Sequence, residues 1–189
     1  MMEIKKQNLV CVFCSSRDGN NPVYLEAAAS LGRALVASGY GLVFGGSNIG
    51  LMGQIARSVH ASNGEVVGIM VRVFMDMEGC ADKIGHTVVV DDVPEGRVMM
   101  NDLACAFITL PGGFATLDEL LDIASWSMRS IHSKPVIVLN TNGYYDALRG
   151  MLTSAVDAGF IPEENKNIIM FCDTPEEAVK AIATYCASS

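Results

Sequence analysis

Two glycine-rich turns that follow apolar strands constrain the fold of this chain more than any other feature. Residues 110–119 read LPGGFATLDE after the apolar run 105–110, and residues 41–53 read GLVFGGSNIGLMG. In both stretches a strand pattern passes through glycines into a helical pattern, which is the connection found in parallel βαβ units. Two such turns predict a crevice at the carboxyl ends of the strands, where open α/β sheets bind ligands.

The rest of the chain continues this alternation of strand and helix patterns. We predict strands at residues 9–14, 41–44, 65–71, 86–90, 105–110, 135–139 and 168–171. We predict helices at residues 22–38, 50–62, 96–104, 117–128, 144–158 and 175–186, with an irregular segment at 72–85. The pattern predicts a Rossmann-like, doubly wound α/β fold: a mostly parallel sheet with helices on both faces, in one domain over residues 1–189.

Composition excludes several classes of function. The net charge of -8 and the pI near 4.8 argue against a nucleic-acid binder. No apolar run approaches the roughly 20 residues that span a bilayer, and the start of the chain does not have the pattern of a signal peptide. Six cysteines scattered through core-like segments are typical of a reducing compartment, so we expect a cytoplasmic protein without a membrane partner. The positive mean hydropathy predicts an oligomer interface.

The glycine turns favour a phosphate ligand. Free backbone N–H groups and the helix dipole at a helix start attract an anion, and glycine lets the ligand approach the main chain. A dinucleotide fits poorly, because GGSNIG departs from G-x-G-x-x-G and no carboxylate falls near Met70–Arg72 to bind a ribose. No Gly-Lys-Ser/Thr follows either turn, which excludes a P-loop. A tight turn without a ligand stays open as an alternative.

Glu119 has two possible roles. Thr116 and Glu119 have the spacing of a capping box, in which each side chain bonds a backbone N–H at the helix start. Thr174 and Glu177 have the same spacing and predict a capping box too. Spacing alone favours capping for Glu119, whereas the Pro-Gly-Gly before it favours an active site.

Other reactive residues have simpler explanations. Cys11 and Cys14 lie three apart in a predicted strand, so their side chains should reach opposite faces rather than form a redox pair. The remaining cysteines and the three histidines show no metal-binding spacing. We therefore expect no metal site.

The motifs taken together resemble the Lonely Guy family, the cytokinin riboside 5'-monophosphate phosphoribohydrolases once labelled possible lysine decarboxylases. The likeness covers nearly the whole chain. It is carried by VFCSS (12–16), NPVYLEAA (21–28), GLMG (50–53), LPGGFATLDEL (110–120), IHSKP (131–135), GYYDAL (143–148) and DAGFI (157–161).

The resemblance implies a Rossmann-like homodimer that hydrolyses the N-glycosidic bond of a nucleoside 5'-monophosphate, with no organic cofactor or metal. It implies that Glu119 is catalytic, because a carboxylate stabilises the oxocarbenium-like transition state of glycosidic cleavage. We expect Arg97 to be its catalytic charge partner, from one position beyond the family's arginine. The phosphate and ribose would be bound by residues of three turns: Ser15, Gly45, Gly46, Ser47, Gly112, Gly113, Ala115 and Thr116.

Four positions depart from the family pattern. Ala115 and Ser47 replace glycines, Met128 replaces a glutamine, and an ungapped count puts Gly96 in place of the family's arginine, one position before Arg97. If residue 115 needs a positive φ, alanine costs about 1 kcal/mol there. The alternative function is therefore an impaired homologue that binds a nucleotide without cleaving it. A decarboxylase would need a Schiff-base lysine, and neither Lys83 nor Lys134 has a recognisable setting for one.

Overall fold

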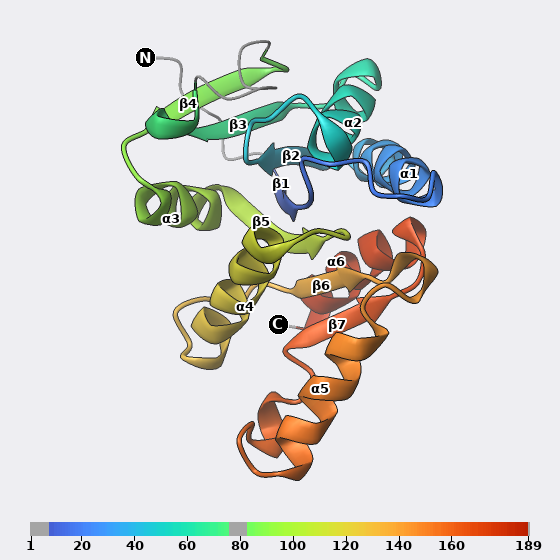
Figure 1. Ribbon diagram of the computed structural model, residues 1–189, viewed down its shortest axis with the longest axis vertical. Helices are drawn as coiled ribbons and strands as arrows, with labels where there is room; N and C mark the ends of the chain where they lie inside the picture. The colour runs from blue at the N-terminus through green and yellow to red at the C-terminus, as the bar shows by residue number, and fades with distance from the viewer. Residues whose placement is uncertain (1–7, 76–82, 189) are drawn as a thin grey trace.

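The computed structural model describes residues 8–75 and 83–188, and its strands form one parallel sheet (Figure 1). The strand order is β4-β3-β2-β1-β5-β6-β7, and each neighbouring pair is parallel. The predicted Rossmann-like α/β fold is thus confirmed, with the described sheet entirely parallel. In the described ranges, no helix has both the length and the apolar character to cross a membrane.

Most predicted elements agree with the structure to within two residues. The strands are β1 (Leu9–Phe13), β2 (Gly41–Phe44), β3 (Val66–Val71), β4 (His86–Val90), β5 (Ala104–Thr109), β6 (Val136–Leu139) and β7 (Ile169–Cys172). The α-helices are α1 (Val23–Ala37), α2 (Gly50–Ala61), α3 (Val93–Leu103), α4 (Phe114–Met128), α5 (Asp146–Asp157) and α6 (Pro175–Ser188). The segment predicted to be irregular contains a short 3-10 helix, Arg72–Phe74, and its residues 76–82 lie outside the described part.

Two helix starts were predicted three residues too late. Helix α3 begins at Val93 because the Asp92 side chain caps it, accepting a hydrogen bond from the Glu95 N–H at 2.8 Å. Helix α4 begins at Phe114, directly after Gly113, and has no capping side chain. The second shift decides the role of Glu119, as described below.

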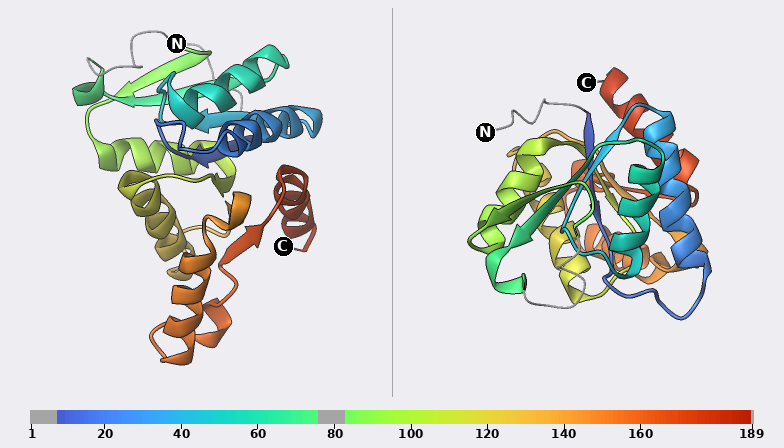
Figure 2. Two further views of the ribbon diagram at one scale, coloured as in Figure 1. Left: turned by 45° about the vertical axis from the view of Figure 1, so that its right-hand side comes forward. Right: turned by 90° about the horizontal axis from the view of Figure 1, so that it is seen from above.

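The helices cover both faces of the sheet (Figure 2). Helices α1, α2 and α6 pack on one apolar cluster, and α3, α4 and α5 pack on the other. Side chains of β1 alternate between the two clusters, so Cys11 belongs to one and Cys14 to the other. The prediction that these two thiols do not form a redox pair is therefore confirmed.

The topology fixes where a ligand can bind. Strand β1 is central: the chain proceeds from it outward to β4 on one side, then returns to β5 on its other side. Strand order reverses between β1 and β5, and the crevice at such a switch point is where open α/β sheets bind ligands. Both Ser15 and the PGG loop (Pro111–Gly113) follow these two strands.

Candidate active site

A pocket of about 590 Å³ opens at this switch point. Its lining comes from the loops after β1, β2 and β5 and from helices α3 and α4. Part of this lining is polar or backbone: Ser15, Ser16, Arg17, Gly45, Gly113, Ala115, Thr116, Asp118, Glu119 and Arg97. The rest of the lining is mainly apolar: Cys14, Met52, Ile69, Val71, Phe74, Val93, Gly96, Met100 and Phe114. The pocket can therefore hold a ligand with a polar part and a flat or apolar part.

Ser15 joins the three loops. Its N–H donates to the Pro111 carbonyl at 3.3 Å, and its carbonyl accepts from the Met52 N–H at 3.2 Å. Gly50 makes this junction possible: it has φ +60°, and a Cβ there would lie 2.2 Å from the Ser16 carbonyl carbon. The loop after β1 is thus pressed against the start of α2, which fixes the floor of the pocket.

Glu119 lines the pocket from the second turn of α4. Burial raises the pKa of its carboxyl to about 7; the Arg97 charge opposes that rise, and the Asp118 charge adds to it. The same burial raises the pKa of the adjacent Cys14 thiol, and the Glu119 charge raises it further. A carboxyl with such a pKa exchanges a proton near neutral pH, which suits acid–base chemistry.

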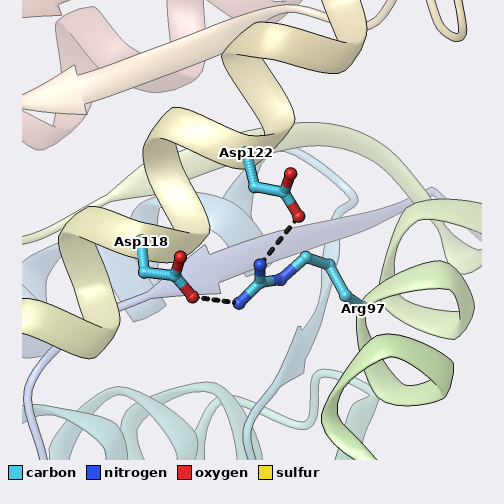
Figure 3. Close-up of polar contacts among 3 residues, drawn as sticks. All are labelled: Arg97, Asp118 and Asp122. Carbon is cyan, nitrogen blue, oxygen red and sulfur yellow. Dashed lines mark hydrogen bonds and ion pairs between the residues drawn. The ribbon is translucent and has the colours of Figure 1, made fainter.

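Arg97 reaches from α3 to α4 and lies between two aspartates (Figure 3). Its Nη1 donates to Asp122 and its Nη2 to Asp118, both at 2.7 Å. The side chain is only 13% exposed. Burial alone would lower the pKa of Arg97, but these hydrogen bonds raise it, so the guanidinium stays charged. Two carboxylates adjacent to Glu119 in the helix therefore offset the charge of Arg97.

The pocket brings together seven of the ten residues predicted for the site: Ser15, Gly45, Arg97, Gly113, Ala115, Thr116 and Glu119. Gly46, Ser47 and Gly112 belong to the same loops but do not line the pocket. Gly112 has a packing role, because a Cβ there would lie 2.1 Å from the Thr116 Oγ1. Its carbonyl accepts a 2.7 Å hydrogen bond from the Tyr144 hydroxyl.

The capping role that spacing favoured for Glu119 is wrong. Because α4 starts at Phe114, Thr116 is already the third residue of the helix and cannot cap it. The second capping box is confirmed: the Glu177 N–H donates to Thr174 Oγ1 at 3.2 Å, and Glu177 Oε2 accepts from the Thr174 N–H at 3.3 Å. Glu119 therefore has the same spacing as Glu177 without its structural function.

The departures from the family pattern have different consequences. Ala115 lies within α4 and does not have a positive φ, so alanine causes no backbone strain there. Ser47 is 8% exposed, and its hydroxyl has no hydrogen-bond partner among the described residues. Gly96 is buried where it lines the pocket, and a Cβ there would meet Val90 Cγ2 at 3.3 Å.

Sequence reasoning missed three charged residues of this region. Asp118 and Asp122 hold Arg97, and their spacing of four residues on one helix was a visible signal that they share a face. Arg17 lines the pocket from the loop after β1. It follows the two serines that the sequence placed near the crevice, but nothing in the local pattern indicated its direction.

Comparisons with known proteins show the family of the chain. Residues 52–182 match the family model described as "Possible lysine decarboxylase". Cytokinin riboside 5'-monophosphate phosphoribohydrolase LOG5 of Arabidopsis thaliana is 40% identical over 186 residues, covering 97% of this chain and 82% of that protein. The probable cytokinin riboside 5'-monophosphate phosphoribohydrolase LOGL2 of Oryza sativa subsp. japonica is 39% identical over 176 residues, covering 93% and 72%.

Solved structures share the fold. The molybdenum cofactor binding protein of Rippkaea orientalis superposes with a TM-score of 0.70 at 20% identity, covering 95% of this chain and 98% of that one. The molybdenum cofactor carrier protein of Chlamydomonas reinhardtii gives 0.68 at 16% identity, covering 96% and 99%. At these identities the likeness concerns the fold alone.

Proposed function

Because this chain belongs to the Lonely Guy family, we propose that it hydrolyses the N-glycosidic bond of a nucleoside 5'-monophosphate, releasing the base and ribose 5-phosphate. One observation carries the proposal: the partly buried Glu119 carboxyl lines the same pocket as the start of α4 and the glycine loop after β2. The start of α4 can bind the phosphate through its free N–H groups. The apolar residues that line the pocket can contact the base and any apolar substituent that the base carries.

The reaction needs one carboxyl that can both stabilise positive charge and move a proton. As the bond from ribose C1' to the base nitrogen breaks, its electron pair goes to the base and positive charge builds on the sugar. The ionised Glu119 stabilises that charge. Water then bonds to C1' and gives one proton to Glu119. The departing base nitrogen takes up one proton from solvent, and Glu119 releases its proton to solvent, so the hydrolysis balances and the carboxylate is restored.

The remaining proposed site residues support the substrate. Arg97 of α3 forms ion pairs with Asp118 and Asp122 of α4. These pairs determine the electrostatic potential at the Glu119 carboxyl. The N–H groups at the start of α4, together with Thr116 and Ser15, bind the phosphate. The loop after β2 contacts the ribose. No step of this scheme calls for an organic cofactor or a metal ion.

The direct test is base release. The purified chain is incubated with AMP and with N6-isopentenyl-AMP, and free base is measured by chromatography. We expect release from at least one substrate and its loss in Glu119→Gln. Glu177→Gln is the matched control, because that residue has the same sequence spacing but caps a helix away from the pocket. Equal release by Glu119→Gln and the parent chain would contradict the proposed role.

One observation favours the impaired homologue as second candidate. Position 96 is glycine, and the neighbouring Arg97 is already engaged by two aspartates. A missing transition-state partner typically costs about 3–4 kcal/mol in catalysis. Thermal stabilisation by either nucleotide, without any base release, would select this binding function over hydrolysis.

We further propose a homodimer formed through α4 and α5. No residue of α5 is buried, and this helix extends beyond the rest of the molecule (Figure 1). Leu121, Met128 and Phe160 are 45%, 43% and 85% exposed around an apolar groove of about 260 Å³. Light scattering should give about twice 20.2 kDa for the wild type. Met151→Glu on the exposed side of α5 should give the monomer mass, whereas the equally exposed Val73→Glu should not.

The cytoplasm is the compartment that we propose. Cys11 and Cys14 are free and buried, and Cys172 is also a free thiol. Unpaired core cysteines are typical of proteins that fold under reducing conditions.

A further inference from the structure

Arg17 is a cationic residue of the pocket whose charge no described carboxylate offsets through an ion pair. Among the described residues that line it, the cationic side chains are Arg17 and Arg97. Asp118 and Asp122 offset the charge of Arg97, and Glu119 adds a further negative charge when ionised. Without Arg17, a phosphate monoester with nearly two negative charges would enter a neutral to negative site on a protein of net charge -8.

Arg17 is available for a ligand. It is exposed, and of the carboxylates that the structure describes, none forms an ion pair with its guanidinium. This distinguishes it from Arg97, which has two such partners.

The backbone beneath Arg17 is fixed. Its N–H donates to the Ser15 Oγ at 2.9 Å, and Ser15 itself is bonded to both neighbouring loops. The close approach of Gly50 to the same backbone prevents this loop from moving inward. Arg17 therefore extends from a rigid loop and lines the same pocket as the start of α4.

We propose that Arg17 is the residue that recognises the 5'-phosphate and so selects nucleoside monophosphates over nucleosides. A guanidinium presents a planar fork of donors that matches two phosphate oxygens, while the N–H groups at the start of α4 bind the third. The serine hydroxyl that holds the Arg17 backbone can still donate its own hydrogen to the phosphate. This inference rests on the proposed function and adds the determinant of substrate class.

The test compares AMP with adenosine for the wild type, Arg17→Gln and Arg17→Lys. The matched control is Arg33→Gln, which removes an exposed arginine of α1 that does not line this pocket. In Arg17→Gln we expect kcat/KM for AMP to fall about 10- to 100-fold, mostly through KM, as expected for the loss of a charge-assisted hydrogen bond. The value for adenosine should not change. Arg17→Lys should recover part of the loss, because it keeps the charge without the fork.

A binding measurement separates this proposal from the proposed reaction. AMP and inorganic phosphate should each raise the melting temperature of the wild type and of Arg33→Gln, and raise it much less in Arg17→Gln. This readout needs no turnover, so it tests Arg17 even if the wild type releases no base. An AMP-to-adenosine preference that is the same in Arg17→Gln and the wild type, in kinetics or in binding, would overturn the assignment.

Discussion

Glu119 should make the stability of the fold depend on pH in a way that Glu119→Gln removes. The pKa of this carboxyl rises from its ordinary value of 4.5 to about 7 in the folded chain, chiefly through burial. Between these two values the folded state binds more protons than the unfolded state, so stability falls as the pH rises. The full cost of ionising the buried group is about 3 kcal/mol, at 1.36 kcal/mol for each tenfold change in proton affinity.

Urea unfolding of the two proteins at several pH values measures this cost. Glutamine has nearly the same shape but does not titrate, so all other ionisable groups cancel in the difference between the curves. From pH 5 to pH 8 the wild type should lose about 2–3 kcal/mol more than the variant. The buffer must be free of phosphate, because a bound anion would stabilise the folded state.

Two results of the unfolding experiment would contradict the prediction for Glu119. Parallel curves for the two proteins would mean that Glu119 titrates as an exposed carboxyl, and the argument for its proton transfer near neutrality would fail. A wild type that gains stability with rising pH relative to Glu119→Gln would mean that Arg97 outweighs burial at this carboxyl.

Three further substitutions test the local geometry by thermal or urea unfolding. Gly50→Ala should cost more than about 2 kcal/mol, because its Cβ overlaps the neighbouring loop and φ is positive, whereas Gly150→Ala, with open space around it, should be neutral or stabilising. Glu177→Ala should cost about 1 kcal/mol through loss of its cap and leave base release unchanged. Ala115→Gly restores the family glycine but should lower stability by about 0.5–1 kcal/mol, because residue 115 is helical; an increase in stability would contradict the helical assignment.

The fold was predictable from sequence because its signals are local. Apolar runs gave the strands, and the odd spacing of Cys11 and Cys14 already placed their side chains on opposite faces. The start of α4 was not predictable in the same way. Its cap is Gly113, which carries no side chain, and its first residue is Phe114, which is 95% exposed. Neither residue gives the usual polar signal of a helix start.

The charges of the site could not be assigned from sequence because they pair across helices. Arg97 lies 21 and 25 residues from its two partners, and only the packing of α3 against α4 brings them together. The sequence predicted Arg97 as a charge partner of Glu119; its charge does act on that carboxyl, but its hydrogen bonds go to Asp118 and Asp122. The direction of Arg17 likewise depends on the loop contacts made by Ser15 and Gly50.

These pairings explain how three carboxylates can lie close together on α4 beside one arginine of α3. Asp118 and Asp122 together carry two negative charges against one positive charge, so the cluster is already negative before Glu119 ionises. Burial and the Asp118 charge therefore both favour the protonated form of Glu119 in the empty pocket. Positive charge that develops on a ribose next to Glu119 has the opposite effect: it stabilises the carboxylate most strongly in the transition state, where that charge is greatest. In such a site the protonated form of Glu119 is favoured before the reaction, and the ionised form is favoured in the transition state. Because two aspartates already pair with Arg97, a separate cation must bind the phosphate. The division of roles between Glu119 and Arg17 follows from that requirement.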